Sequence, residues 1–388
     1  MIDSLSLTIP QSSAGETRTI RGAVLETIGA PAPYAKSKPI VVQELTLEGP
    51  GPGEVLVRIE AAGVCHSDLS VLNGSRVRPV PMLLGHESAG RVEALGEGVT
   101  DLSIGERVIM AFLPTCGSCD GCAKGGKMPC EPGTTSNNAG TLFSGGIRLS
   151  RGSEKVHHHL GVSGFASHAV VSRNSLVAVG DDVPPDVAAV LGCAVLTGGG
   201  AVINAAKPGP EDTVAVVGLG GVGMAALITA KSLGVAKVVG IDPIESKLTR
   251  AIELGADAAY TSAQVEELGL RFDVVIEAAG HPRAFETAVK VTAPGGTTVT
   301  VGLPAPGQTS TIEPLTITAE ARTIIGSYLG SAVPSRDIPV YAQLWREGKL
   351  PVEELISSRI SLDEINEAMD TLADGLAIRQ IIVFDAEH

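Results

Sequence analysis

Four of the six cysteines lie within fifteen residues, in a C-x2-C-x2-C-x7-C pattern. These cysteines are Cys116, Cys119, Cys122 and Cys130. Four clustered thiolates can complete a tetrahedral shell around one zinc ion and leave no position for substrate, which is typical of a structural zinc site. The N-terminal residues show no secretory pattern, so this spacing favours metal binding over disulfides.

The other two cysteines, Cys65 and Cys193, lie far apart in the sequence, and His86 lies between them. Two thiolates and one imidazole suit zinc and leave a fourth position open for water or a substrate oxygen. Glu87 is a candidate alternative or transient ligand. The sequence therefore predicts a second, catalytic zinc site.

Two polar residues close to Cys65 could serve this metal. Asp68 is the candidate to hold the free ring nitrogen of His86 and so fix its tautomer. Ser67 could take the proton of an alcohol at the metal, because zinc lowers the pKa of bound water to about 7. A lone buried cysteine or histidine is more often a core residue, and only their joint occurrence favours a metal site.

A glycine-rich loop follows the apolar run 213–217 and precedes a helical pattern at 224–233. In its G-x-G-x-x-G pattern, Gly218 permits a tight turn, Gly220 lets the backbone approach a pyrophosphate, and Gly223 allows close helix packing. Gly221 and Val222 complete the predicted dinucleotide loop. The alternative is a glycine-rich turn that binds no ligand.

Asp242 closes the strand that follows, nineteen residues after Gly223. A carboxylate there accepts hydrogen bonds from the adenosine ribose and repels a 2′-phosphate, which favours NAD over NADP. Lys247 lies close enough in sequence to help hold the ribose.

Composition excludes several classes of protein. The chain has 388 residues and a net charge of −14, which argues against a nucleic-acid surface. No run approaches eighteen uninterrupted apolar residues, so no membrane span is predicted. We expect a cytoplasmic protein with two domains or one large domain.

The predicted secondary structure around these residues differs between the two halves of the chain. Short alternating strands at 54–60, 91–95 and 105–109 predict a partly closed, barrel-like N-terminal half. The segment 131–164 is rich in glycine and serine and has little periodicity, so we expect a long surface excursion. We assign the triplet 157–159, three histidines, to that excursion rather than to a metal site.

After Thr197, strands alternate with helices. Apolar runs at 213–217, 237–241, 272–276 and 296–301 predict parallel βαβ units. A last strand at 379–384 is expected to return to the first domain. The predicted fold class is α/β, with a β-rich domain and a doubly wound parallel sheet.

In this order, the motifs resemble the zinc-containing alcohol dehydrogenases of the medium-chain dehydrogenase/reductase superfamily, over about residues 22–384. They are most similar to the branch of dimeric animal alcohol dehydrogenases and glutathione-dependent formaldehyde dehydrogenases, which carries a long insertion at 131–164. The resemblance implies a split GroES-like catalytic domain, 1–194 and 338–388, with a structural-zinc lobe at about 112–131. It also implies a Rossmann NAD domain, 195–337, and a homodimer.

The resemblance also implies functional positions. Cys65, His86 and Cys193 would hold the catalytic zinc, and Ser67 would be the first proton acceptor. The residues assigned to the cofactor in addition to the glycine loop are His66 and Arg379 at the pyrophosphate, Thr197 near the nicotinamide, and Val301.

The sequence differs from the family in the proton relay and in the residues expected to line the substrate pocket. Ser70 stands where well-known members have a histidine that ends the proton relay. Phe112 matches an aromatic wall residue, but Arg76 and His159 stand where the animal enzymes have apolar groups. We expect a substrate with a polar or anionic group; the alternative is that both side chains turn to solvent.

The predicted reaction is hydride transfer between a primary or secondary alcohol and NAD, with two zinc ions per subunit. One alternative is glutathione-dependent formaldehyde oxidation, for which the sequence offers no clear anion site. Another is a non-catalytic, zinc-stabilised nucleotide-binding protein. Loss of Cys65 or His86 would have favoured that reading, and both are present.

Overall fold

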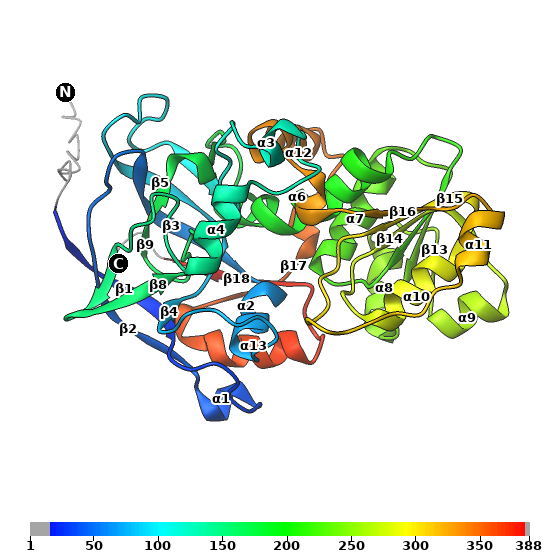
Figure 1. The fold of residues 1–388 in the computed structure, drawn as a ribbon, viewed down its shortest axis with the longest axis horizontal. Helices are drawn as coiled ribbons and strands as arrows, with labels where there is room; N and C mark the ends of the chain where they lie inside the picture. The colour runs from blue at the N-terminus through cyan, green and yellow to red at the C-terminus, as the bar shows by residue number, and fades with distance from the viewer. Residues whose placement is uncertain (1–15, 385–388) are drawn as a thin grey trace, which may run out of the picture.

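The computed structural model describes residues 16–384, which form a barrel and a second sheet at one end and a parallel sheet with its helices at the other (Figure 1). The first strand begins at Arg18.

The N-terminal half contains the predicted barrel. Its closed order is β1-β2-β7-β8-β4. The strands are β1 (Arg18–Leu25), β2 (Ile40–Leu47), β4 (Met82–Leu83), β7 (Leu149–Arg151) and β8 (Glu154–His158). Strand β4 runs parallel to β8, which pairs Leu83 with His158. This pairing brings residues 157–159 next to the segment that leads into Gly85 and His86.

A second sheet supports the chain on which Cys65 lies. Its order is β10-β6-β5-β3-β18-β17, and β9 also pairs with β3. The strands are β3 (Glu54–Val64), β5 (Glu87–Leu95), β6 (Arg107–Met110), β9 (His168–Ser172), β10 (Leu176–Ala178), β17 (Ile356–Ile360) and β18 (Arg379–Val383). The C-terminal strand β18 lies antiparallel to β3, with Gln380 opposite Val64. The predicted return of the chain end is therefore confirmed, and it places Arg379 beside Cys65.

The third sheet is the predicted parallel one, with the order β13-β12-β11-β14-β15-β16. Its strands are β11 (Thr213–Val217), β12 (Lys237–Ile241), β13 (Ala258–Tyr260), β14 (Phe272–Glu277), β15 (Thr292–Thr300) and β16 (Thr323–Gly326). Chain order runs outward from β11 in both directions, through β12 on one side and β14 on the other. A crevice at the carboxyl ends of strands at such a switch point is where open α/β sheets bind ligands.

Helices flank these sheets (Figure 1). Their bounds are α1 (Tyr34–Ser37), α2 (His66–Leu72), α3 (Asp120–Ala123), α4 (Glu131–Ala139), α5 (Pro185–Val190), α6 (Leu196–Gly200), α7 (Gly221–Ser232), α8 (Glu245–Glu253), α9 (Ser262–Glu267), α10 (Pro282–Val291), α11 (Pro314–Ala319), α12 (Pro334–Arg346) and α13 (Ile365–Ala373).

One continuous helical segment, Pro185–Ala206, connects the two halves of the molecule. A π-helical turn at Leu191–Val195 joins α5 to α6, and a second one at Ala201–Ala206 follows α6. This segment is long and apolar enough to cross a membrane by composition, but 89% of its most apolar window is buried within the fold. Its apolar character is therefore explained by core packing, and π-helical turns often occur at functional sites.

The expectation of a surface excursion at 131–164 is wrong. The segment contributes α4 and two barrel strands, and Leu149, Val156 and His158 are each at most 1% exposed. The strands are only three and five residues long, too short for an alternating pattern to stand out among the glycines.

Candidate active site

Four ligand-type side chains meet where the second sheet faces the Pro185–Ala206 segment. The ligand atoms of Cys65, His86, Glu87 and Cys193 all lie within 4.8 Å of one another, and all four residues are buried. Cys65 follows β3 and is the N-cap residue of α2, whereas Cys193 lies in the first π-helical turn. The structure thus brings together the residues predicted to hold the catalytic zinc.

The turn before His86 requires glycine. Gly85 has a φ of +91°, and a Cβ atom at this position would lie 2.4 Å from the backbone nitrogen of Phe165. Only glycine adopts this conformation at such close range without strain. The turn directs the His86 ring toward Cys193, with Nε2 3.5 Å from Sγ.

The donor set fits a tetrahedral zinc ion. Zinc–sulfur bonds of about 2.3 Å and zinc–nitrogen bonds of about 2.0 Å at tetrahedral angles place sulfur and nitrogen about 3.5 Å apart. The separation of Cys193 Sγ and His86 Nε2 matches this value. Both oxygens of Glu87 are buried without a hydrogen-bond partner among the described residues, which suits a neighbouring cation.

Asp68 orients the His86 ring from behind. Its Oδ1 atom lies 3.1 Å from His86 Nδ1 and accepts from Gly85 N–H at 3.1 Å, and its Oδ2 accepts from Cys65 N–H at 3.2 Å. Burial would raise the pKa of Asp68, but the charge of His86 and the contacts of His86 and His159 outweigh it and hold the pKa at about 2. Asp68 is therefore an ionised acceptor that fixes His86 with Nε2 free for the metal.

His159 does not line the substrate side, and that prediction is wrong, as is its solvent-exposed alternative. The residue is 1% exposed, and its Nδ1 atom lies 3.0 Å from Asp68 Oδ1. Its ring packs edge-on against His86, with centroids 5.5 Å apart. Burial lowers the pKa of His159, which favours a neutral ring. His159 lies behind the metal ligands because β8 runs alongside β4.

A buried arginine connects this cluster to the nucleotide loop. Nη1 of Arg379 lies 3.4 Å from Glu87 Oε2 and donates to the carbonyl oxygen of Val64 at 3.0 Å. Its Nη2 atom lies 2.3 Å from where a Cβ of Gly221 would be. Burial raises the pKa of Glu87 to about 7, against the opposing effect of Arg379. Arg379 therefore lies where the resemblance placed it, next to the loop expected to hold the pyrophosphate.

One cavity of about 460 Å³ extends from Cys65 and Cys193 to the nucleotide loop. The other predicted residues that line it are His66, Ser67, Arg76, Phe112, Thr197, Gly218, Gly220, Gly221, Val222, Asp242, Lys247, Val301 and Arg379. Gly223 lies beneath the lining, and a Cβ there would meet the Gly218 carbonyl oxygen at 1.8 Å. A substrate at the metal cluster and a dinucleotide on the loop would thus share one space.

The nucleotide loop is fixed by Asp242. Its Oδ2 accepts from Leu219 N–H at 2.7 Å and its Oδ1 accepts from Ile244 N–H at 3.0 Å. Each carboxylate oxygen keeps a further lone pair that a ribose hydroxyl could use. Gly218, with a φ of +91°, makes the turn that the pattern predicts.

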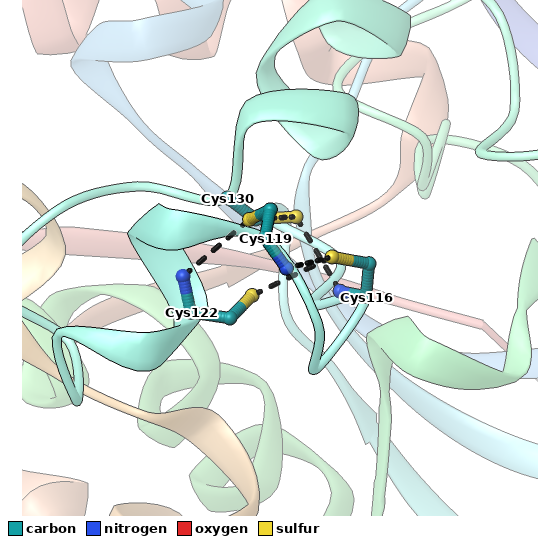
Figure 2. A group of neighbouring side chains, drawn as sticks. All are labelled: Cys116, Cys119, Cys122 and Cys130. Atoms are coloured by element: carbon teal, nitrogen blue, oxygen red, sulfur yellow. Dashed lines mark hydrogen bonds between the residues drawn. The ribbon is translucent and has the colours of Figure 1, made fainter.

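The clustered cysteines converge at the surface near α3, as Figure 2 shows. Sγ of Cys116 lies 3.8 Å from Sγ of Cys122, and Sγ of Cys119 lies 3.9 Å from Sγ of Cys130. Two sulfurs bound to one tetrahedral zinc lie about 3.8 Å apart. All six cysteines of the chain are free thiols, so the geometry fits a metal rather than disulfides.

Tyr328 lines the same cavity, and no motif in the sequence indicates it. Its ring packs edge-on against Phe112 at 6.2 Å, and Phe112 packs edge-on against His86 at 5.7 Å. Tyr328 leads into a turn in which Leu329, Gly330 and Ser331 all have positive φ. Two of these residues are not glycine, so their conformation could not be expected from residue type.

Comparisons with known proteins agree with this architecture. Residues 51–181 match the alcohol dehydrogenase GroES-like domain, and residues 221–347 match the zinc-binding dehydrogenase family. An NDMA-dependent alcohol dehydrogenase from Amycolatopsis methanolica is 35% identical over 364 residues, covering 91% of this chain and 98% of the relative. A geraniol dehydrogenase from Castellaniella defragrans is 36% identical, covering 94% and 97%. The crystal structure of benzyl alcohol dehydrogenase from Acinetobacter calcoaceticus superimposes with a TM-score of 0.86 at 31% identity, covering 95% and 100%.

A GroES-like domain joined to a Rossmann sheet, with thiolate and imidazole ligands facing a nucleotide loop, defines a zinc-binding dehydrogenase. The chain belongs to the zinc-dependent alcohol dehydrogenases of the medium-chain dehydrogenase/reductase superfamily. The predicted fold class and the predicted class of enzyme, an alcohol oxidoreductase, are confirmed.

Proposed function

We propose that this enzyme transfers a hydride between a primary or secondary alcohol and NAD, with Cys65, His86 and Cys193 as ligands of a catalytic zinc. The observation that carries the proposal is the single cavity that joins these ligands to the glycine loop. Zinc would polarise the alcohol oxygen and NAD would accept the hydride. The protein's contribution is to place both in one space and to remove a proton.

Ser67 lies on the cavity wall, as do Cys65, Cys193 and Ser70. In the proposed mechanism its hydroxyl accepts the proton of the alcohol. Ser67 gives up its own hydroxyl proton in the same step, because a serine hydroxyl is not basic and can act only as a relay. Ser70 does not continue this relay, because its Oγ donates to the His66 carbonyl oxygen at 2.7 Å. The proton therefore passes from Ser67 to water in the cavity.

Charged residues at the nucleotide loop support the proposed binding of NAD. Asp242 at the end of β12 favours the unphosphorylated ribose of NAD, and Lys247 lies on the same wall. The Arg379 guanidinium faces Gly221 at the start of α7, where a pyrophosphate would meet both a cation and the helix N-terminus. Thr197 and Val301 would then flank the nicotinamide.

The metal content and assembly are part of the same proposal. We propose two zinc ions per subunit, the second held by Cys116, Cys119, Cys122 and Cys130, in a cytoplasmic homodimer. Support comes from the convergence of the four thiolates and from six unpaired cysteines, which suit a reducing compartment. We also propose that the chain belongs to the branch of dimeric animal alcohol dehydrogenases and formaldehyde dehydrogenases. The support is the segment 131–164, which stands where that branch carries a long insertion. Metal analysis of the purified enzyme tests the two zinc ions per subunit, and light scattering tests the homodimer.

The test of activity is NADH formation with a panel of aliphatic, benzylic and carboxylated alcohols, together with S-hydroxymethylglutathione. We expect turnover by the zinc-loaded enzyme and a loss of at least a thousandfold in Cys65→Ser. A best rate with S-hydroxymethylglutathione would select formaldehyde oxidation as the function. NAD binding without turnover of any member would favour the non-catalytic reading.

A further inference from the structure

Two arginines at the substrate side of the cavity have no carboxylate partner. Among the arginines of residues 16–384, all but Arg76, Arg78, Arg271 and Arg283 lie within 4.0 Å of an acidic side chain. The chain carries a net charge of −14, so acidic partners are abundant. Two free guanidiniums, two residues apart in one loop, therefore need an explanation.

Their polar contacts are few and neutral. Nη2 of Arg76 donates to the carbonyl oxygen of Leu303 at 3.3 Å, and Nη1 of Arg78 donates to the side-chain oxygen of Asn138. Each guanidinium has five N–H donors, so most of these donors remain available. Arg76 lines the cavity, whereas Arg78 is half-buried and is not part of the lining.

Tyr328 shows where this charge lies relative to the metal. Tyr328 and Arg76 both line the cavity. Burial raises the pKa of Tyr328, and the positive charges of Arg76 and Arg78 oppose that shift. From the metal ligand His86, the wall continues through Phe112, at 5.7 Å, to Tyr328, a further 6.2 Å. Tyr328 lines the same cavity as Arg76, and a phenol hydroxyl can donate a hydrogen bond to an anion.

We propose that the substrate is an alcohol with a carboxylate at its far end, bound by Arg76 and Tyr328, with an apolar, ring-sized spacer between the two groups. The inference rests on the proposed function, since it takes the hydroxyl end to lie at Ser67 and the metal cluster. The planar guanidinium suits a carboxylate geometrically, and Arg78 adds positive potential. The two aromatic walls contact the spacer.

The experiment compares three probes of similar shape: 4-(hydroxymethyl)benzoate, its neutral amide, and 4-methylbenzyl alcohol. The quantity measured is the ratio of kcat/KM for the carboxylate to kcat/KM for the amide, at low and at high salt. We expect the wild type to favour the carboxylate by about tenfold or more, as for a hydrogen bond to a charged group, and Arg76→Leu to bring the ratio close to one. Arg271→Leu is the matched control, because Arg271 also has no acidic partner but is exposed just before β14 and does not line the cavity. This variant should keep the wild-type ratio.

Two results of this kinetic comparison would overturn the inference, and a binding measurement described below supplies a third. One is a wild-type ratio near one. The other is an equal loss on all three probes in Arg76→Leu, which would show that Arg76 acts through its contact with Leu303. Binding of benzoate to the enzyme–NAD complex, measured by calorimetry, separates this inference from the proposed function. Binding that Arg76→Leu abolishes, without turnover of any probe, would keep the anion site and reject the dehydrogenase mechanism; absence of binding would reject the site.

Discussion

Nδ1 of His86 lies 3.1 Å from Oδ1 of Asp68, and both side chains are fully buried. The contact holds the imidazole with its other nitrogen toward Cys193. Because Asp68 is ionised and also accepts from the backbone of Cys65 and Gly85, it ties two predicted metal ligands to one carboxylate. The predictions below follow from this relationship and from the loop on the other side of the cavity.

Replacing Asp68 by asparagine should weaken zinc binding and activity by about 10- to 100-fold, because the amide offers one oxygen in place of a charged carboxylate. Competition with a chelator measures the affinity, and kcat/KM measures the activity. Asp363→Asn is the control, since it removes an exposed carboxylate that pairs with Arg21. Unchanged zinc affinity in Asp68→Asn would show that His86 does not depend on this contact.

Replacing His159 by alanine distinguishes two roles. If His159 supports Asp68, as its 3.0 Å contact indicates, the variant should lose zinc affinity by less than Asp68→Asn does, because Asp68 keeps its other partners. Its relative rates across the alcohol panel should stay the same. A changed substrate preference with unchanged zinc affinity would instead place His159 on the substrate wall.

Replacing Asp242 by asparagine should raise the ratio of kcat/KM with NADP to kcat/KM with NAD by about tenfold, because it removes the charge that repels a 2′-phosphate. The ratio is the readout, since the loop itself also uses this carboxylate. Asp257→Asn is the matched control: it accepts from the backbone of Val238 in the same sheet but does not line the cavity. Equal NADP-to-NAD ratios in the two variants would show that Asp242 stabilises the loop but does not select between the cofactors.

Much of the site could be predicted because its residue types are rare and chemically selective. Cysteines and one histidine in the order Cys65, His86, Cys193 indicate a metal wherever the chain brings them together. Asp68 could be assigned to His86 across eighteen residues because a metal-ligating imidazole needs an acceptor for its second nitrogen. Such inferences depend on the metal-binding and hydrogen-bonding chemistry of each residue type, which can be read directly from the sequence.

The predictions that were wrong or missing depend on three-dimensional geometry that no local sequence pattern indicates. The direction of His159 is set by the pairing of β8 with β4, which no local pattern in 131–164 indicates. Tyr328 reaches the cavity through a turn with positive φ at Leu329 and Ser331, a conformation that neither residue type favours. Tertiary packing imposes both features.

The buried His158 should make stability depend on pH. Burial lowers its pKa to about 3, with the charges of His157 and Arg148 adding to the effect. Its ordinary pKa is about 6.5, so the unfolded chain binds a proton that the folded chain excludes between these values. The free energy of unfolding should be unaffected by His158 above pH 6.5 and should fall as the pH drops from 6.5 toward 3.

Urea unfolding of the wild type and of His158→Gln, between pH 4 and 8, measures this contribution. One excluded proton corresponds to a slope of about 1.4 kcal/mol per pH unit, and the variant should lose that part of the slope. The same slope in both proteins would mean that His158 is neutral in both states or charged in both.

Isotope transfer shows whether the thiolate–imidazole cluster and the glycine loop serve one reaction in one cavity. Benzyl alcohol deuterated at its carbinol carbon is incubated with NAD and enzyme, and the NADH is analysed by mass spectrometry and NMR. We expect one deuterium at C4 of the nicotinamide. We also expect NADH formation to stop when a chelator removes the metal and to recover with zinc alone. NADH that contains hydrogen from solvent, or deuterium transfer that continues unchanged without metal, would contradict the proposed mechanism.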